Sequence, residues 1–181
     1  MEAMGKLIKM KVLLVGLRGV GVECAKNLIL AGPNTVDLYD PTTVSINDLG
    51  SNFYLKEEHV GKVSRARASH QQLCELNGNV RVNVLDNLTL EDHANYNVVC
   101  YSENLNGFKN ILQANNFCHE KNVGFILCET LGLFGYAFVD YGEKHGVNDA
   151  DGENCQQFIV VNVTQDEEAV VTVHEDKRHS Y

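Results

Sequence analysis

Residues 11–28 constrain the fold of this chain more than any other stretch. Four apolar residues at positions 12–15 (Val-Leu-Leu-Val) run directly into glycines at positions 16, 19 and 21, and an amphipathic helix pattern follows. An uninterrupted run of this kind predicts a strand buried on both faces, as in a parallel sheet. The glycines allow a sharp turn that points backbone N–H groups at whatever lies above the helix N-terminus. The stretch is typical of the first half of a dinucleotide- or ATP-binding βαβ unit.

The spacing of these glycines departs from the dinucleotide-binding fingerprint. It reads Gly-x-x-Gly-x-Gly rather than Gly-x-Gly-x-x-Gly, so Arg18 stands where the fingerprint has its middle glycine. That glycine lets the backbone approach a pyrophosphate closely, and a side chain at the same place blocks the approach. The sequence therefore favours a Rossmann-like fold whose loop has lost its nucleotide over one whose loop still binds it.

Strand and helix patterns alternate along the chain after this loop. Helices are predicted over residues 20–31, 62–77 and 108–121, and strands over 35–40, 80–85, 98–100 and 123–128. Residues 41–60 read as a long irregular connection with Phe53 and Tyr54 as aromatic anchors, and a loop of that length usually has a function or covers an interface. The alternation predicts an α/β fold with a mostly parallel, doubly wound sheet.

The pattern changes near the C-terminal end. Phe134, Tyr136 and Phe138 alternate with smaller residues, and we expect this stripe to pack on a helix or a partner rather than to hold a ligand. Residues 142–154 are rich in glycine and acids and predict a boundary, and residues 158–163 and 169–174 predict a β-hairpin beyond it. The prediction is a Rossmann-like domain over 1–147 and the start of a small all-β module over 148–181, because one hairpin cannot bury a core.

Composition argues against several classes of function. The formal net charge of −9 argues against general affinity for nucleic acid or an anionic membrane. No stretch approaches the roughly 20 apolar residues of a membrane span, and we expect an intracellular protein. The six cysteines contain no CxxC pair and fall mostly in predicted helices and buried strands, so we expect small core residues rather than disulfides, zinc ligands or a nucleophile.

Four stretches, in order, resemble the ubiquitin-activating enzymes. They are the loop and helix from Leu17 to Gly32, the segment Asp48-Leu-Gly-Ser-Asn-Phe-Tyr-Leu-Lys-Glu-Glu-His-Val-Gly-Lys, the segment Glu129-Thr-Leu-Gly-Leu-Phe-Gly-Tyr-Ala-Phe-Val-Asp-Tyr-Gly-Glu, and the tail Glu175-Asp-Lys-Arg-His-Ser. The resemblance implies a ThiF/MoeB-like domain, which this family has as one active and one inactive adenylation half. It also implies that the tail begins the first catalytic-cysteine half-domain.

The site positions resemble those of the inactive half. Where the active half has an acid for the ribose, an arginine for the nucleotide, a lysine for phosphate and an aspartate for magnesium, this chain has Thr42, Ser51, Arg65 and Asn106. Adenylation needs positive charge and Mg²⁺ to neutralise the departing pyrophosphate. The resemblance therefore implies a half that does not catalyse adenylation.

A degenerate nucleotide loop is the candidate site. Its predicted cofactor-binding residues are Gly16, Arg18, Gly19, Gly21, Asp40 and Arg65. No catalytic residue and no metal ligand is predicted, and we expect no cofactor on this chain, with ATP and Mg²⁺ bound elsewhere in the parent enzyme. A pairing face without its partner also predicts that the isolated chain self-associates.

The resemblance implies a fragment of a longer, ligase-type enzyme. The parent would adenylate the ubiquitin C-terminus with ATP and Mg²⁺ and then form a thioester on a cysteine outside this chain. This chain would be a structural half that pairs with the active adenylation half and helps to shape the ubiquitin cleft. Expected partners are that half, ubiquitin and, through the parent, ubiquitin-conjugating enzymes, with neither nucleic acid nor a membrane, in the cytoplasm and nucleus.

Two alternatives stay open at this point. The small subunit of a SUMO-type activating enzyme fits the glycine loop nearly as well, but it has no counterpart of the β-rich tail after Gly152. An NAD-dependent Rossmann oxidoreductase would use Asp40, near the end of the second strand, to hold a ribose, and Arg18 counts against it.

Overall fold

The computed structural model describes all residues except 1, 106, 147–157, 166–168 and 176–181. The chain divides into two units, Met1–His145 and Gly146–Tyr181, which are described separately. The division falls two residues before the boundary predicted at 147/148. Most of the segment predicted to carry that boundary, and the candidate position Asn106, lie outside the described residues.

The first unit is built on one six-stranded sheet. Its strands, in chain order, are β1 (Lys11–Val15), β2 (Thr35–Tyr39), β3 (Arg81–Val84), β4 (Val98–Tyr101), β5 (Gly124–Leu131) and β6 (Phe134–Asp140). Their order in the sheet is β3-β2-β1-β4-β5-β6. The first five are parallel, and β6 pairs antiparallel with β5 at the edge. The predicted mostly parallel α/β fold is confirmed.

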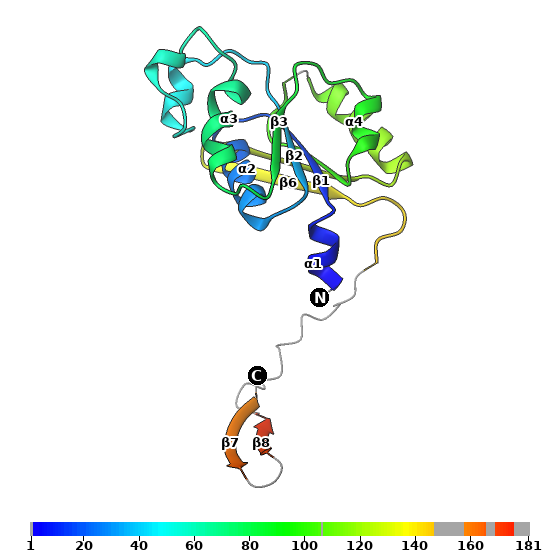
Figure 1. Ribbon diagram of the computed structural model, residues 1–181. Coiled ribbons are helices and arrows are strands. Elements are labelled where there is room, and N and C mark those ends of the chain that lie inside the picture. The colour runs from blue at the N-terminus through cyan, green and yellow to red at the C-terminus, as the bar shows by residue number, and fades with distance from the viewer. Residues whose placement is uncertain (1, 106, 147–157, 166–168, 176–181) are drawn as a thin grey trace. The chain divides into compact units, whose positions relative to one another are not determined.

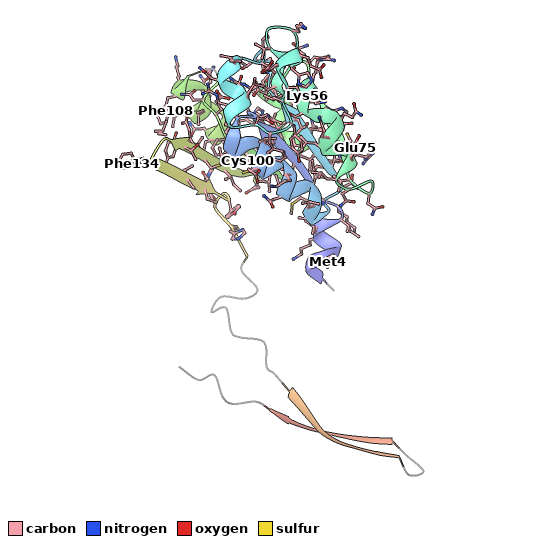
Figure 2. The ribbon with its side chains drawn as sticks, turned by 90° about the vertical axis from the view of Figure 1, so that its left-hand side faces the viewer. Met4, Lys56, Glu75, Cys100, Phe108 and Phe134 are labelled. Carbon is pink, nitrogen blue, oxygen red and sulfur yellow. The ribbon has the colours of Figure 1, made fainter. Side chains whose placement is uncertain are left out.

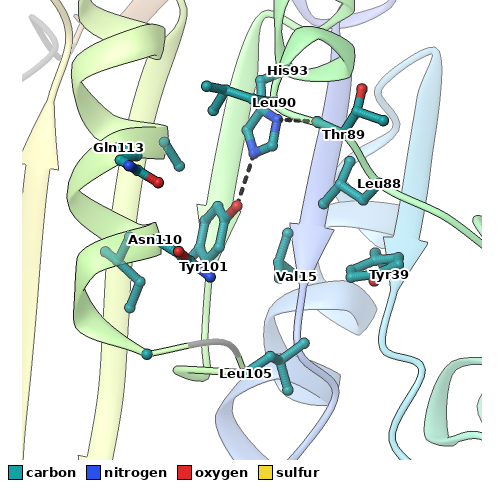
Figure 3. Close-up of a pocket in the computed structure, with 13 residues that line it drawn as sticks. Val15, Tyr39, Leu88, Thr89, Leu90, His93, Tyr101, Leu105, Asn110 and Gln113 are labelled. Atoms are coloured by element: carbon teal, nitrogen blue, oxygen red, sulfur yellow. Dashed lines mark hydrogen bonds between the residues drawn. The ribbon is translucent and has the colours of Figure 1, made fainter.

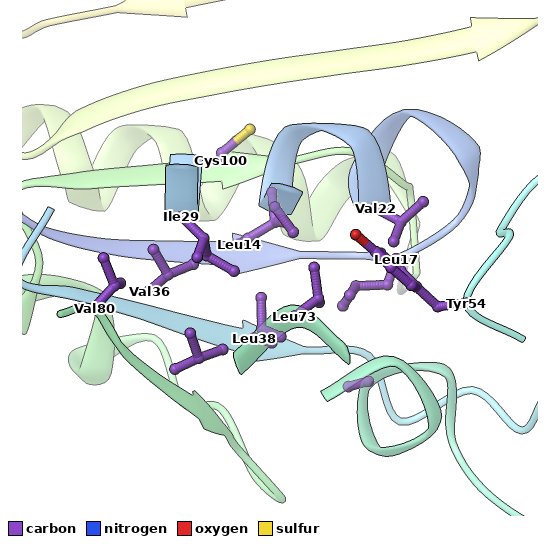
Figure 4. Packing of buried hydrophobic residues seen from close by; sticks show 13 residues of the cluster. Leu14, Leu17, Val22, Ile29, Val36, Leu38, Tyr54, Leu73, Val80 and Cys100 are labelled. Atoms are coloured by element: carbon purple, nitrogen blue, oxygen red, sulfur yellow. The ribbon is translucent and has the colours of Figure 1, made fainter. Parts of the chain in front are cut away.

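Helices cover both faces of this sheet (Figure 1). Helices α2 (Gly19–Ala31) and α3 (Arg65–Glu75) cover one face and α4 (Phe108–Glu120) covers the other, while the short α1 (Glu2–Leu7) precedes β1. One core cluster joins α2 and α3 to one face of the sheet, and Figure 4 shows Ile29 of α2 and Leu73 of α3 packed around Leu14 of β1. A second cluster joins α4 to the opposite face through Ile111, Ala114 and Cys118. β1 is thus buried on both faces, as its apolar run predicts.

Helix α3 begins later than the sequence predicts. The sequence pattern predicts a start at residue 62, but the helix starts at Arg65, because the Ser64 hydroxyl caps it by accepting the Arg67 N–H. Thr43 and Ser64 form an isolated antiparallel bridge, which holds the residues before Arg65 in an extended conformation.

Strand β5 is longer than predicted and reaches Leu131, because its outer half pairs with β6.

The connection after β2 is irregular, as predicted, but only one of its two aromatic anchors is buried. It contains two short 3₁₀ helices, η1 (Ile46–Gly50) and η2 (Glu57–His59). Tyr54 packs into the core around α2 and α3. Phe53 is 60% exposed, with the Lys26 ammonium 5.5 Å from its ring centre, so its prediction as an anchor is wrong.

The described part of the second unit is a β-hairpin. Its strands β7 (Phe158–Gln165) and β8 (Ala169–Glu175) pair antiparallel, with a register shift between Val160 and Asn162. The predicted hairpin is confirmed. Its assignment to a catalytic-cysteine half-domain stays a prediction.

Candidate functional site

The glycine loop lies where the order of the sheet reverses. From β1 the chain continues to β2 and β3 on one side of the sheet and then returns to β4 and β5 on the other side. The loop after β1 therefore lies at the carboxyl ends of the neighbouring strands β1 and β4, between the two halves of the sheet. Ligands of open α/β sheets bind in the crevice at this switch point. The topology therefore places the predicted loop at the position where a nucleotide would be expected.

The glycines of this loop are required by close packing of the protein on itself. Gly16 has φ +93°, and a Cβ on Gly21 would lie 2.2 Å from the Gly16 carbonyl oxygen. The Ser102 hydroxyl, at the end of β4, donates to that same oxygen at 2.7 Å. A Cβ on Gly19 would come within 3.2 Å of the Ser51 Cβ. Glycine at positions 16 and 21 therefore follows from the fold whether or not a ligand binds, while the contact at Gly19 is tight but not prohibitive.

Asp40 is engaged with backbone groups of the loop. It is 1% exposed, and its carboxylate accepts the Leu17 N–H at 2.8 Å and the Thr42 N–H at 2.9 Å. An acid that holds a ribose must offer its oxygens to the ligand. The oxygens of Asp40 are used within the protein, which argues against the oxidoreductase alternative.

Arg65 reaches the loop from the first residue of α3. Arg65 is 3% exposed, and three carboxylates lie around its guanidinium. Nη1 lies 2.9 Å from Glu103 and 3.4 Å from Asp40, and Nε forms an ion pair with Asp48 at 3.0 Å. The residue predicted to replace a phosphate-binding lysine is therefore neutralised by the chain itself.

Arg18 completes the same network from the loop side. Its Nε lies 3.4 Å from Glu103 and 3.6 Å from Asp48, and its side chain is half exposed. We call Arg18, Asp40, Asp48, Arg65 and Glu103 the loop ion-pair cluster. With two arginines and three carboxylates, its formal charge is −1 when all five groups are ionised.

Burial and ion pairing shift the pKa values in this cluster in opposite directions. Burial raises the pKa of Glu103 above its ordinary 4.5, and Arg65 and Arg18 oppose this only in part. Burial also acts upward on Asp48, but hydrogen bonds from the Ser45 N–H and from Arg65 bring its pKa below the ordinary 3.8. For Arg65 burial acts to lower the pKa, and the three carboxylates outweigh it, so the guanidinium stays charged.

The six predicted site residues come together at this loop, and sequence reasoning missed the residues that pair with them. Asp48 lies in the irregular connection, where the Ser45-x-x-Asp48 spacing of a capping box was a usable signal. Glu103 follows β4, so it lies at the carboxyl edge of the sheet. Of the positions suggested by resemblance, Thr42 contributes its backbone to Asp40 and Ser51 lies against Gly19.

A buried asparagine fixes the loop to the connection after β2. Asn52 is 0% exposed, and its amide donates to the Leu17 carbonyl at 3.0 Å and to the Ser69 hydroxyl at 3.1 Å. Its side-chain oxygen accepts the Tyr54 N–H. The loop is thus held by contacts from three directions: β4, α3 and the connection.

Comparison with known families decides the identity of this fold. The model of the ThiF family matches residues 1–146. The chain belongs to the ThiF family. Among solved structures, the crystal structure of E. coli MccB with succinimide superimposes with a TM-score of 0.68 over 82% of this chain and 46% of the other, at 19% identity, which supports the ThiF/MoeB-like Rossmann fold.

Several curated proteins are more similar to this chain in sequence than MccB is. The chain is 41% identical over 178 residues to ubiquitin-like modifier-activating enzyme 1 of Dictyostelium discoideum and 40% identical over 178 residues to ubiquitin-activating enzyme E1 1 of Candida albicans, in each case across 98% of the chain. It is 39% identical over 181 residues to the human ubiquitin-like modifier-activating enzyme 1. The chain spans 17% of the length of each of these relatives.

This ThiF-family chain also has a small cavity on the α4 face (Figure 3). Its volume is about 190 Å³, and His93 stands on its wall with Nε2 2.8 Å from the Tyr101 hydroxyl and Nδ1 3.0 Å from the Thr89 carbonyl. Burial lowers the pKa of His93 and favours the neutral ring. A nucleotide site usually needs about 300 Å³ or more, so this cavity is too small for one.

The edge strand leaves apolar side chains uncovered. Phe134 is 79% exposed and Phe138 47%, and Figure 2 shows Phe134 at the margin of the unit. By register these two share a face with Leu131 and Leu127, which is the α4 face. Nothing in the described part of the chain packs over Phe134, so no helix there covers this end of the stripe. The other prediction, that a partner covers it, stays open.

The part of the chain that the structure describes contains neither a metal-binding group nor a membrane-spanning helix. No group of three or more His, Cys, Asp or Glu side chains there is arranged to hold a metal ion. No helix in that part is long and apolar enough to cross a membrane.

Proposed function

We propose that this chain is a non-catalytic adenylation half of a ubiquitin-activating enzyme and that it pairs with the active half of the same enzyme. Its identity of 38–41% to enzymes with that name supports the parent activity. The relatives extend well beyond the matched region, since the chain spans 17% of their length. Residues outside this chain would therefore perform the chemistry.

The loop ion-pair cluster is the observation that carries the non-catalytic part of this proposal. Adenylation requires cationic groups aimed at the phosphates, because negative charge builds up on the leaving pyrophosphate. Both arginines near the loop, Arg18 and Arg65, are paired with carboxylates, and the cluster has a formal charge of −1. A nucleoside triphosphate would add anionic groups beside buried carboxylates, and this is unfavourable without additional cations.

In this proposal the parent enzyme binds ATP and Mg²⁺ in its active half. It adenylates the ubiquitin C-terminal carboxylate and transfers ubiquitin to a cysteine outside residues 1–181. This chain supplies pairing surface and a wall of the ubiquitin cleft, and ubiquitin-conjugating enzymes meet the parent afterwards. We place the enzyme in the cytoplasm and nucleus.

The exposed stripe of β6 supports pairing. Large aromatic side chains that are more than about 40% exposed on one edge strand are unfavourable in water. A partner that covered Phe134 and Phe138 would remove this cost. The same surface explains why the isolated chain is expected to self-associate.

Exchange of labelled pyrophosphate into ATP tests the proposal. The chain is incubated with ubiquitin, Mg·ATP and labelled pyrophosphate, beside an intact ubiquitin-activating enzyme as positive control. We expect no ubiquitin-dependent exchange by the chain alone, because reversal of adenylation needs cations aimed at the phosphates, and Arg18 and Arg65 are paired with carboxylates instead. Ubiquitin-dependent exchange that is lost on Arg65→Met would assign adenylation to this half and overturn the proposal.

A further inference from the structure

A second cavity lies on the opposite side of the sheet from α4. Its volume is about 530 Å³, and it is bounded by α2 and by strands β4 and β5. Most of its wall is apolar, with Val20 and Leu28 from α2 and Ile126 from β5. Among the described residues that line it, only Glu23 and Asn27 carry polar groups besides thiols. We call it the thiol cavity.

Cysteines from three separate elements meet at this cavity. Cys24 comes from α2, Cys100 from β4 and Cys128 from β5, and all three line its wall. Cys100 is buried on the α2 side of the sheet (Figure 4), while Cys24 and Cys128 are partly exposed. The sequence predicts only small core residues here, because the spacings of 76 residues (Cys24 to Cys100) and 28 residues (Cys100 to Cys128) do not reveal that the three share a cavity.

The three thiols act on one another. The neighbouring thiol of Cys100, and after it that of Cys128, lowers the pKa of Cys24. The same contacts, together with burial, raise the pKa of Cys100. Cys24, which is also partly exposed, is thus the member of the group whose pKa is lowered, and a thiolate is the nucleophilic form of cysteine.

The shape and lining of the cavity define what could react there. The described residues offer no arrangement suited to a metal ion, so a thiolate-bound metal is not favoured. A volume of about 530 Å³ lies within the range of small-molecule sites, and the wall favours apolar groups. Burial of an apolar molecule against Val20, Leu28 and Ile126 would hold it beside the Cys24 sulfur.

We propose that the thiol cavity is a covalent binding site for small apolar electrophiles and that the Sγ of Cys24 is the atom they modify. For an α,β-unsaturated carbonyl compound, the sulfur electron pair forms an S–C bond to the β-carbon. The C=C π pair moves to the α-carbon, which takes a proton from a neighbouring thiol or from water. No oxidant, reductant or metal is consumed, and the product is a stable thioether.

Site-resolved labelling with N-phenylmaleimide tests this proposal. The folded 181-residue chain is treated with less than one equivalent, quenched in denaturant and digested, and each cysteine is quantified by mass spectrometry. Cys74 is the matched internal control, because it is also a partly buried helix thiol and burial raises its pKa. We expect Cys24 to react at least about tenfold faster than Cys74 in the folded chain, since rates follow thiolate fraction and access. This preference should vanish in urea.

Two further comparisons separate the cavity from simple exposure. Cys100→Ala with Cys128→Ala removes both neighbouring thiols and should slow labelling of Cys24, with circular dichroism as the check on folding. Ala31→Phe narrows the cavity wall and should slow N-phenylmaleimide more than the smaller, polar iodoacetamide. Equal labelling of Cys24 and Cys74 in the folded chain would overturn the proposal, and equal slowing of both reagents by Ala31→Phe would overturn the role of the cavity.

Discussion

The glycine loop and the edge strand β6 use their side chains in opposite ways. At the loop, buried charged groups satisfy one another: Arg65 is 3% exposed and has three carboxylate neighbours. At β6, large apolar groups are left in water, and Phe134 is 79% exposed. At the loop the charged side chains are already paired with one another. At β6 the aromatic side chains have no covering contact in the described part of the chain. This difference supports the proposal that the chain contributes a pairing surface rather than a nucleotide site.

Loss of the central cation should break the loop side of this comparison with the largest effect. Arg65→Met leaves Asp40, Asp48 and Glu103 without their shared partner, and removal of one member of a buried ion pair costs about 3–5 kcal/mol. We expect that loss in the free energy of unfolding, measured by urea denaturation followed by circular dichroism.

Arg67→Met is the matched control for that variant. Arg67 lies two residues along the same helix and pairs with Asp86, but both side chains are more than half exposed. An exposed pair contributes about 0–1 kcal/mol, so this change should be small. Similar losses in the two variants would show that the cluster is no more important than a surface ion pair.

The tight contact between the loop and its own helix gives the second prediction. Gly21→Ala places a Cβ 2.2 Å from the Gly16 carbonyl oxygen and 2.3 Å from the Ser102 hydroxyl. Overpacking of this kind costs about 1–3 kcal/mol, measured again by urea denaturation. Gly78→Ala, with no atom within 4 Å of the added Cβ, should change stability little. A neutral Gly21→Ala would mean that the glycine is not held by packing.

The edge-strand side of the comparison is tested by self-association. Phe134→Ser with Phe138→Ser should weaken self-association of the chain by about tenfold or more, because truncating a buried aromatic contact commonly costs over 1 kcal/mol. Sedimentation velocity over a concentration series measures this. Ile46 is an apolar residue away from β6 that is also well exposed, at 65%, and Ile46→Ser should leave association unchanged. If Ile46→Ser has the same effect, association is a general property of exposed apolar groups.

The smallest expected effect is a difference in pH dependence between two carboxylates of the cluster. The pKa of Asp48 is lowered by folding, so its contribution to stability is present above its ordinary 3.8 and is lost as pH falls through the lower folded value. The pKa of Glu103 is raised, so its contribution is present below its ordinary 4.5 and is lost as pH rises through the higher folded value.

Variants of these two residues should therefore diverge in acid. Between pH 7 and pH 3, the stability advantage of the unmodified chain over Asp48→Asn should shrink as pH falls. Over the same range, the unmodified chain should gain stability relative to Glu103→Gln. Thermal unfolding across this pH series gives both slopes. Slopes of the same sign would contradict the opposite pKa shifts.

Much of the fold could be predicted, because its signals are local. The apolar run at 12–15 and the glycines after it specify a strand, a turn and a helix within a few residues. The six predicted site residues converge because Asp40 and Arg65 follow or begin elements whose order the alternation already indicates.

What the sequence could not give is the pairing of charges across the loop. Asp48 comes from an irregular segment and Glu103 from the end of β4, and their approach to Arg65 depends on which strand lies beside β1. The exposure of Phe134 also depends on tertiary structure, since its alternating pattern is the same in a covered and an uncovered strand.

Calorimetric titration of the folded chain with Mg·ATP tests the central claim most directly. We expect no saturable heat, because Arg18 and Arg65 near the glycine loop are already paired and the cluster has a formal charge of −1. Saturable binding at micromolar affinity, abolished by Arg65→Met but retained by Arg67→Met, would contradict it. That result would mean that Arg65 exchanges its carboxylates for phosphate and that the loop still holds a nucleotide.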